Sequence, residues 1–451
     1  MLSRPGSVTV PARLDVLLNF NDTNIIRMDD TYFRRGFGLS KQVEPLVHAE
    51  YHSDLVTRLR AAGNREMFGE GDQQVSVRLA ESFGFCYGVD RAVDYAYQTR
   101  TQFPDRSIFL VGEIIHNPHV NTRLQQMGIT FLYPANDGKD EGRFDFSGIT
   151  PADVVILPAF GVTLEDFERL RKLGCSVVDT TCGSVLNVWK RVDQYARDGF
   201  TALVHGKYRH EETKATASQV FKHDGGAYII VFDMEEARLV MDYIEQKPGA
   251  LDREAFLEHF STRSSPGFDP DLHLRQIGCA NQTTMLAGES LAIAAEVGRS
   301  LERRYGSDPA FDIANHFRSF DTICSATQER QDAVMALMEA AEGPPDIMLV
   351  IGGYNSSNTN HLAVICARHT TTYHIADASC IDPERGTIRF KPNGTPLDTA
   401  EMEAEDWLPR GRLSVGLTAG ASTPNNKIGE TLELLLQTRG ILIGPVAAVK
   451  S

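Results

Sequence analysis

Three cysteines, each placed directly before an expected helix, constrain this chain more than any other feature. Cys86, Cys182 and Cys324 each follow a short apolar stretch. The amphipathic runs that come after them span residues 90–98, 185–196 and 328–341. A thiol at a helix start lies near the positive end of the helix dipole, which favours the thiolate that binds metals. Because the three are far apart in the sequence, a small zinc knuckle is excluded, and we expect three separate lobes that each contribute one thiolate.

Three thiolates around one centre favour an iron–sulfur cluster with one iron that no protein group binds. Such clusters normally take four cysteines, and an open metal position is typical of a catalytic site. The alternative is three unrelated core cysteines, since free cysteine is often buried. The remaining cysteines lie in or near apolar segments and are interpreted as core or incidental residues: Cys175, Cys279, Cys366 and Cys380.

Composition limits the classes of function and the cellular compartments that fit this chain. The chain has 451 residues and a net charge of −15, which argues against a general nucleic-acid binder but still allows a local site for a small anion. Seven scattered cysteines fit a reducing compartment. No apolar run approaches the roughly 20 residues of a membrane-spanning helix, and residues 1–30 lack the features of a secretory or transit signal. We therefore expect a cytoplasmic protein with neither membrane nor nucleic-acid partners.

The order of the apolar patterns predicts an α/β protein. Residues 1–74 read as an N-terminal extension, with a helical pattern over 41–59 that serves as a packing arm or an oligomer contact. From residue 75 strands and helices alternate, which predicts parallel sheets covered by helices. The expected lobes are residues 75–182, 183–320 and 321–451 with the C-terminal segment. Every polar motif falls at the carboxyl end of an expected strand, where such sheets bind ligands.

Six polar motifs accompany the cysteines in a specific order. They are His-Asn-Pro at 116–118, His-Glu-Glu-Thr at 210–213, Ala-Asn-Gln-Thr-Thr-Met at 280–285, Ala-Thr-Gln-Glu-Arg-Gln at 326–331, Asn-Ser-Ser-Asn at 355–358 and Thr-Ala-Gly-Ala-Ser at 418–422. Together they resemble the 4-hydroxy-3-methylbut-2-enyl diphosphate reductases, which perform the last step of the methylerythritol phosphate route to isoprenoids. The resemblance covers residues 75–435. Segments 34–38 and 157–161 are similar to the cyanobacterial and plastid branch of that family.

The resemblance implies a fold, a cofactor and a reaction. The fold would be three α/β lobes in a pseudo-threefold, clover-like arrangement around a central [4Fe–4S] cluster, held by Cys86, Cys182 and Cys324. The iron without a protein ligand would bind the allylic hydroxyl of the substrate. The reaction would be reductive dehydroxylation of 4-hydroxy-3-methylbut-2-enyl diphosphate to isopentenyl diphosphate and dimethylallyl diphosphate. An external electron donor of the ferredoxin or flavodoxin type would be needed, and the extension could support an oligomer.

The resemblance also assigns the polar residues. Glu212 would be the proton source, because a carboxyl in a dry pocket beside an anion can hold a proton near neutral pH. Thr283 would relay that proton or orient the substrate hydroxyl, whereas Glu211 is interpreted as solvated. The residues expected to bind the diphosphate are His116, His210, Ser356, Ser357, Asn358 and Ser422. The alternatives are a solvated glutamate at a helix start, a threonine at a strand end and a cluster of N-cap residues.

Two positions depart from the family pattern. Gly183 follows Cys182 where the family usually has proline, which should loosen that loop. Phe160 stands where the short bacterial enzymes carry a histidine, so one polar contact with the diphosphate is missing. Our hypothesis is that Lys207, three residues before His210, supplies the missing charge on its flexible stem; the alternative is a surface lysine.

Two other function classes stay open at this point. A quinolinate-synthase-like enzyme also uses three lobes and three cysteines around an open cluster, but it would not need motifs 355–358 and 418–422 in this order. An iron–sulfur sensor or scaffold would need a nucleic-acid or partner surface, and no basic stripe is evident. Turnover of the allylic diphosphate separates the three.

Overall fold

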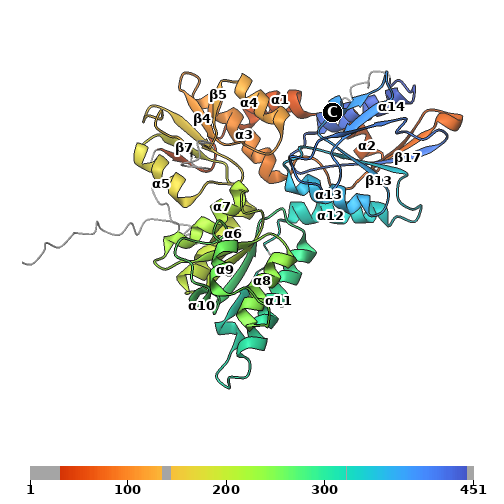
Figure 1. Cartoon of the computed structure of the whole chain (residues 1–451). Coiled ribbons are helices and arrows are strands. Elements are labelled where there is room, and N and C mark those ends of the chain that lie inside the picture. The colour runs from red at the N-terminus through yellow and green to blue at the C-terminus, as the bar shows by residue number, and fades with distance from the viewer. Residues whose placement is uncertain (1–30, 135–143, 321, 444–451) are drawn as a thin grey trace, which may run out of the picture.

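The computed structural model describes residues 31–134, 144–320 and 322–443; residues 1–30 of the expected extension lie outside this part. The chain forms three lobes that meet at a common centre (Figure 1). Each lobe is a parallel or mostly parallel sheet with helices packed against it. The expected α/β class with three lobes is therefore confirmed.

The first lobe is built on five parallel strands in the order β1-β7-β6-β4-β5. Its strands are β1 (Tyr32–Phe33), β4 (Ile108–Val111), β5 (Ile129–Leu132), β6 (Val154–Leu157) and β7 (Ser176–Asp179). Its helices are α1 (Ser40–Tyr51), α3 (Tyr87–Gln102), α4 (Pro118–Gln126) and α5 (Leu164–Leu173). Strand β6 reads Val-Val-Ile-Leu and is buried throughout, as expected of a parallel strand covered on both faces.

The second lobe has four parallel strands in the order β11-β10-β8-β9. They are β8 (Thr201–His205), β9 (Tyr228–Val231), β10 (Ile277–Asn281) and β11 (Phe317–Ser319). Its helices are α6 (Gly183–Arg197), α7 (Glu211–Ala217), α8 (Met234–Glu245), α9 (Arg253–His259), α10 (Pro270–His273) and α11 (Ala287–Tyr305). Helix α8 packs on α11 over one face of this sheet, and their apolar sides form the core with Phe256 and Phe260 of the α9 region.

The third lobe combines both ends of the described chain. Its sheet has the order β13-β12-β17-β3-β2, in which only β2 runs antiparallel. The strands are β2 (Arg65–Phe68), β3 (Val75–Leu79), β12 (Ile347–Ile351), β13 (Thr371–Ile375) and β17 (Leu413–Ala419). The helices are α2 (Asp54–Ala61), α12 (Ser325–Met338), α13 (Ser357–Ala367) and α14 (Asn425–Thr438). A small antiparallel sheet beside them contains β14 (Ile381–Asp382), β15 (Thr387–Phe390) and β16 (Met402–Glu405).

The expected lobe boundary at residues 74 and 75 does not follow these sheets. Strand β3 was assigned to the first lobe, but it pairs with β17 and β2 in the third sheet. Strand β1 belongs to the first sheet, and helix α1 packs against α3 through the buried Val43 and Tyr51. The described part of the extension is thus an integral packing element. Strand pairing between distant segments leaves no local pattern, so this boundary could not be found from the sequence.

The carboxyl ends of the parallel strands point towards the centre shared by the lobes. The loops after β4, β8 and β12 carry motifs 116–118, 210–213 and 355–358. Side chains from different lobes bond there: the Ser422 hydroxyl donates to the His116 carbonyl at 3.2 Å, and His361 bonds the Thr284 carbonyl at 2.9 Å. The three lobes therefore enclose one shared site.

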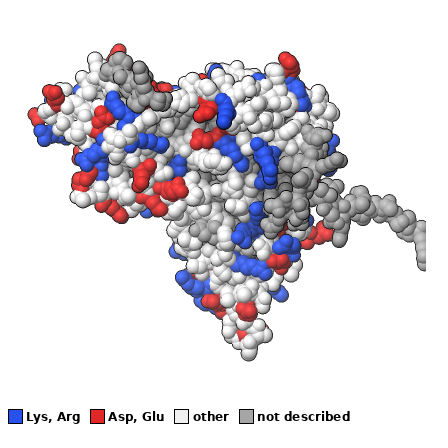
Figure 2. Space-filling model, turned by 180° about the vertical axis from the view of Figure 1, so that it is seen from behind, with Lys and Arg blue, Asp and Glu red and all other residues white. Residues whose placement is uncertain are grey.

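The surface carries both signs of charge. On the face seen in Figure 2, acidic and basic side chains both occur on all three lobes. Within the described ranges, none of the helices is both long enough and apolar enough to cross a membrane.

Candidate active site

The three cysteines occupy equivalent positions in the three-lobed frame. Cys86 is the N-cap residue of α3, Cys182 that of α6 and Cys324 that of α12. Two of them flank Gly88: a side-chain carbon there would lie 2.5 Å from Sγ of Cys182 and 3.8 Å from Sγ of Cys86. The first distance is far below a normal contact, so glycine leaves the space that these two sulfurs need.

The arrangement of the thiols fits a multinuclear cluster better than a single ion. The charge of Cys182 raises the pKa of Cys86, and the charge of Cys86 raises the pKa of Cys324. The three thiols therefore interact electrostatically. Their sulfur atoms nevertheless do not form a set within 4.8 Å of one another in the described ranges, as ligands of one ion would. Thiolates are the usual ligands of iron–sulfur clusters, each bound to a different iron. Three thiolate donors that lie too far apart to bind one ion therefore fit the expected iron–sulfur cluster.

Burial changes the acidity expected of these thiols. The helix-start position predicts a lowered pKa, and a backbone N–H does donate to Sγ of Cys324, from Thr327 at 3.3 Å. Burial is the larger effect: it raises the pKa of Cys86, and it raises the pKa of Cys324 to about 11. A bound metal would be needed to hold these thiols as thiolates.

Glu212 lies in the interior at this centre. It is 2 % exposed, and its carboxylate accepts a hydrogen bond of 2.6 Å from the backbone N–H of Thr283. The Thr283 hydroxyl also lowers the pKa of this carboxyl, and the Thr283 carbonyl accepts from the N–H of Cys324 at 3.3 Å. Burial raises the pKa of Glu212, and this effect exceeds the lowering of the pKa by Thr283. The expected pairing of Glu212 with Thr283 is thus present in the geometry.

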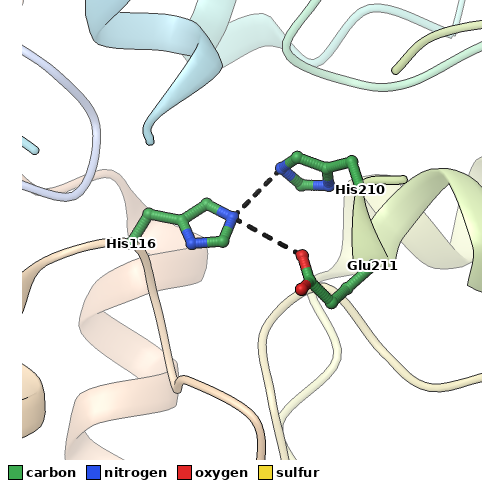
Figure 3. A group of neighbouring side chains, drawn as sticks. All are labelled: His116, His210 and Glu211. Atoms are coloured by element: carbon green, nitrogen blue, oxygen red, sulfur yellow. Dashed lines mark hydrogen bonds and ion pairs between the residues drawn. The ribbon is translucent and has the colours of Figure 1, made fainter. Parts of the chain in front are cut away.

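His116 and His210 meet between the first and second lobes (Figure 3), with their Nε2 atoms 3.0 Å apart. The N–H of Glu212 donates to Nδ1 of His210, so Nε2 of His210 carries the proton and donates to His116. His116 then holds its own proton on Nδ1, which donates to Glu113 at 2.9 Å. Both rings are oriented by the protein before any ligand binds.

Glu211 completes this group, and it is not the purely solvated residue expected from the sequence. Its carboxylate lies 4.0 Å from Nε2 of His116, although the side chain is 45 % exposed. Two histidines and a carboxylate could hold a metal ion. However, the protonated Nε2 of His210 is a donor and cannot ligate a metal in this state. Burial keeps the pKa of His210 well below its ordinary value, so the ring remains a neutral donor.

Phe160 packs directly on both histidines. Its ring stacks on His116 with a centroid distance of 4.3 Å and meets His210 edge-on at 5.6 Å. The departure from the family pattern therefore lies at the expected diphosphate site, where an apolar ring supports the two imidazoles.

The third lobe brings the remaining polar residues to the same centre. Ser356 is the N-cap of α13, and Ser357 and Asn358 form its first turn; all three are buried. The Asn358 side chain accepts from the N–H of Ala421 at 3.0 Å, but its Nδ2 has no partner among the residues that the structure describes. A buried amide donor without a partner, at a helix start, fits an anionic ligand that is bound there.

Lys207 is half-buried in the loop after β8, and its charge lowers the pKa of both His210 and His361. Burial lowers the pKa of Lys207 itself, with no opposing carboxylate among the described residues. Lys207 is thus partly withdrawn from solvent, and its charge acts on both histidines.

Sequence reasoning missed three residues of this site. The side chain of Gln282 is fully buried and binds both the N–H of Lys207 and the hydroxyl of Thr213. Nδ2 of Asn355 lies 3.2 Å from Glu113, which holds His116. Each lies within or beside a motif already noted, but its role depends on a partner from elsewhere in the chain.

The fold and site define a class of three-lobed α/β proteins with thiols, a buried carboxyl and polar side chains at a shared centre, and comparison with known proteins identifies the family. A family model described as "LytB protein" matches residues 77–436, and the chain belongs to this family. It is 46 % identical to the 4-hydroxy-3-methylbut-2-enyl diphosphate reductase of Thermosynechococcus vestitus, over 92 % of this chain and 97 % of that one. The enzyme of the same name from Gloeobacter violaceus is 45 % identical over 91 % and 93 %. The expected resemblance to cyanobacterial reductases is confirmed.

One solved structure supports the fold. The E-1-hydroxy-2-methyl-but-2-enyl-4-diphosphate reductase from Plasmodium falciparum matches with a TM-score of 0.53 at 20 % identity, covering 80 % of this chain and 87 % of that one.

Proposed function

We propose that this chain is a 4-hydroxy-3-methylbut-2-enyl diphosphate reductase, the terminal enzyme of the non-mevalonate route to isoprenoids. It takes two electrons and two protons, breaks the allylic C–O bond and releases water with isopentenyl or dimethylallyl diphosphate. One proton leaves with the hydroxyl as water, and the other is added to the allylic carbon skeleton. Membership of the LytB family and the agreement over nearly the full length of named relatives support this function.

One observation carries the proposal: three thiols, a buried carboxyl and buried donors for an anion meet at a single centre. A diphosphate-binding module would not need the thiols of Cys86, Cys182 and Cys324. An iron–sulfur sensor would not need the buried Glu212 or the unpartnered amide of Asn358. Reductive removal of a hydroxyl from a diphosphate ester needs all three groups.

The three cysteines would hold one [4Fe–4S] cluster with one iron free of protein ligands. When bound, this cluster supplies electrons and a Lewis-acidic iron for the hydroxyl. The contact of Gly88 with the sulfurs of Cys86 and Cys182 supports the assignment, because any side chain there would displace them.

Glu212 would hold the proton for the reaction. Burial raises its pKa, so the protonated carboxyl is available closer to neutral pH than in water. The N–H of Thr283 bonds one carboxylate oxygen of Glu212, which holds the carboxyl in place. The hydroxyl of Thr283 would orient the substrate's oxygen.

The diphosphate would lie between the histidine pair and the start of α13. The Nε2–H of His210, which donates to His116 in the structure, would be redirected to a phosphate oxygen, and Asn358 offers its free Nδ2. The backbone N–H groups at the start of α13 favour phosphate oxygens. The residues proposed to bind the diphosphate are His116, His210, Ser356, Ser357, Asn358 and Ser422, whereas Thr283 would bind the substrate at its hydroxyl.

Lys207 would add a positive charge that Phe160 cannot provide. Burying a diphosphate requires donors or cations. The charge of Lys207 lowers the pKa of His210, in the second lobe, and of His361, in the third lobe. Lys207 would therefore place its charge in the space between these two lobes. A cation there would attract the diphosphate and offset the negative charge of the chain.

The proposed partners and compartment follow from the reaction. Electrons would come from an external carrier of the ferredoxin or flavodoxin type, in the cytoplasm. An oligomer could form through the exposed side of the segment that precedes β3. Neither a nucleic acid nor a membrane is part of this proposal.

The test is anaerobic turnover. The chain is purified without oxygen and given the allylic diphosphate and a chemical one-electron reductant. The expected result is the formation of both five-carbon diphosphates, with no reaction on the corresponding alcohol. Substrate that remains unconverted by protein with a full cluster would reject the proposed function.

A further inference from the structure

Arg330 joins the two chain segments that carry Cys86 and Cys324. It lies in helix α12 and is only 3 % exposed. Its guanidinium donates to the carbonyl of Gly84 at 2.6 Å and to that of Ala326 at 2.8 Å. Each of these carbonyls stands two residues from a cysteine. The guanidinium is therefore fixed to both of the segments that carry these thiols.

This guanidinium is a buried charge that lacks an ordinary counter-ion. Arginine stays protonated in proteins, and an unpaired buried charge is strongly unfavourable. Within the described ranges no carboxylate oxygen forms an ion pair with it, and its Nε has no hydrogen-bond partner. The negative groups that act on it most are the thiolate forms of Cys86 and Cys324, ahead of Glu329. Neutral thiols cannot balance such a charge, but metal-bound thiolates can.

We propose that Arg330 is the counter-ion of the cluster: a positioning residue that holds the thiolates of Cys86 and Cys324 and raises the reduction potential of the cluster. This rests on the proposed function. An oxidised [4Fe–4S] core carries two positive charges and three thiolates carry three negative ones, so the centre has one net negative charge. One electron from the external carrier makes it doubly negative. A fixed cation nearby favours that reduced state.

The surroundings of Arg330 decide which variants are informative. It lines a surface pocket of about 560 Å³ together with Cys86, Arg60 and Glu329. Replacing Arg330 by alanine would remove the charge and would also let water reach the Cys86 thiol, so the two effects could not be separated. Arg330→Gln removes the charge but keeps a side chain that fills space and can donate, whereas Arg330→Lys keeps the charge.

Arg78 offers a matched control. It is 5 % exposed and also donates to two backbone carbonyls, those of Gly343 and Leu337. Unlike Arg330 it also has a carboxylate partner, since its Nε lies 3.5 Å from Glu342, and no cysteine of the described ranges acts on it. Arg78→Gln therefore tests the loss of a buried, carbonyl-bound guanidinium away from the cluster.

The measurement is the midpoint potential of the cluster, by anaerobic redox titration followed spectroscopically. In Arg330→Gln the equilibrium constant for one-electron reduction should fall about tenfold, which is about 59 mV to more negative potential. Arg330→Lys and Arg78→Gln should stay near the parent value. If Arg330→Gln loses the cluster and Arg330→Lys retains it, this result also supports a role for the positive charge.

Two results would overturn the inference. A parent-like potential in Arg330→Gln, or loss of the cluster in both Arg330 variants, would reduce Arg330 to a structural link. A parent chain that binds no cluster would reject the proposed function, whereas a parent that holds its cluster and an Arg330→Gln variant with the same potential would reject this inference alone, so the two failures are distinguishable.

Discussion

The backbone N–H of Thr283 donates a 2.6 Å hydrogen bond to the buried carboxylate of Glu212. The carbonyl of the same Thr283 accepts from the N–H of Cys324 at 3.3 Å. One residue thus links the expected proton source to an expected cluster ligand. Because these are backbone groups, their positions depend on the end of strand β10 and not on a mobile side chain.

Replacing Glu212 by glutamine should separate proton supply from binding. The glutamine side chain would keep the shape and could still accept the bond from Thr283, but it has no carboxyl proton to give. We expect an intact cluster, near-parent KM and turnover reduced by about 10²–10⁴-fold. Steady-state kinetics on anaerobic protein check this, with Glu235→Gln, an exposed glutamate in the first turn of α8, as the control. Activity of the Glu212 variant within a few-fold of the parent would remove Glu212 from the mechanism.

Lys207→Met should weaken substrate binding and leave kcat largely unchanged, if the ammonium binds ground and transition states alike. A charged hydrogen bond is worth about 1.5–3 kcal/mol, so KM should rise by about one to two orders of magnitude. Adding Phe160→His should restore part of the affinity, because the ring lies against His116 and His210. Lys214, which is exposed and also acts on His210, gives the matched control Lys214→Met. An unchanged KM at moderate salt would assign Lys207 to the solvated surface.

Gly183→Pro should stabilise the start of α6. Gly183 is the first helical residue, and a side-chain carbon there would meet no atom within 4 Å. Cys182 before it has φ −60° and ψ 142°, the extended conformation that proline requires of its predecessor. Proline should add about 0.4–1 kcal/mol by restricting the unfolded chain. A higher thermal midpoint than in Gly183→Ala is expected, and a lower midpoint or reduced iron content would contradict it.

Acid should destabilise the second lobe through His205. This ring is 2 % exposed, bonds Ser290 and the Phe232 carbonyl, and burial lowers its pKa to about 4. The unfolded chain takes up the proton near pH 6.5, so the stability present above that pH is lost as the pH falls towards 4. The slope is at most about 1.4 kcal/mol per pH unit for one proton.

The check is the free energy of unfolding measured across that pH range. His205→Gln should show a shallower acid slope than the parent, whereas the exposed His369→Gln should not. Equal slopes in the parent and the His205 variant would show that His205 does not bind its proton in the way described.

Sequence patterns predicted the elements of this site better than the contacts between them. Cys86, Cys182 and Cys324 precede helices in the sequence and are N-cap residues in the structure, since helix starts have a local signature. The place of β3 in the third sheet depends on pairing with β17, which is distant in sequence. Arg330 lay in a noted motif, but its role depends on the Gly84 carbonyl across the molecule.

The cluster is the central claim, and metal analysis of the cysteine variants tests it most directly. Iron and sulfide are measured in anaerobically purified parent, Cys86→Ala, Cys182→Ala and Cys324→Ala, with the buried Cys175→Ala and Cys279→Ala as controls. The account predicts about four irons per chain and a brown chromophore in the parent and both controls, and loss of iron or activity in each of the other three. Full iron content together with full activity in Cys324→Ala would contradict it.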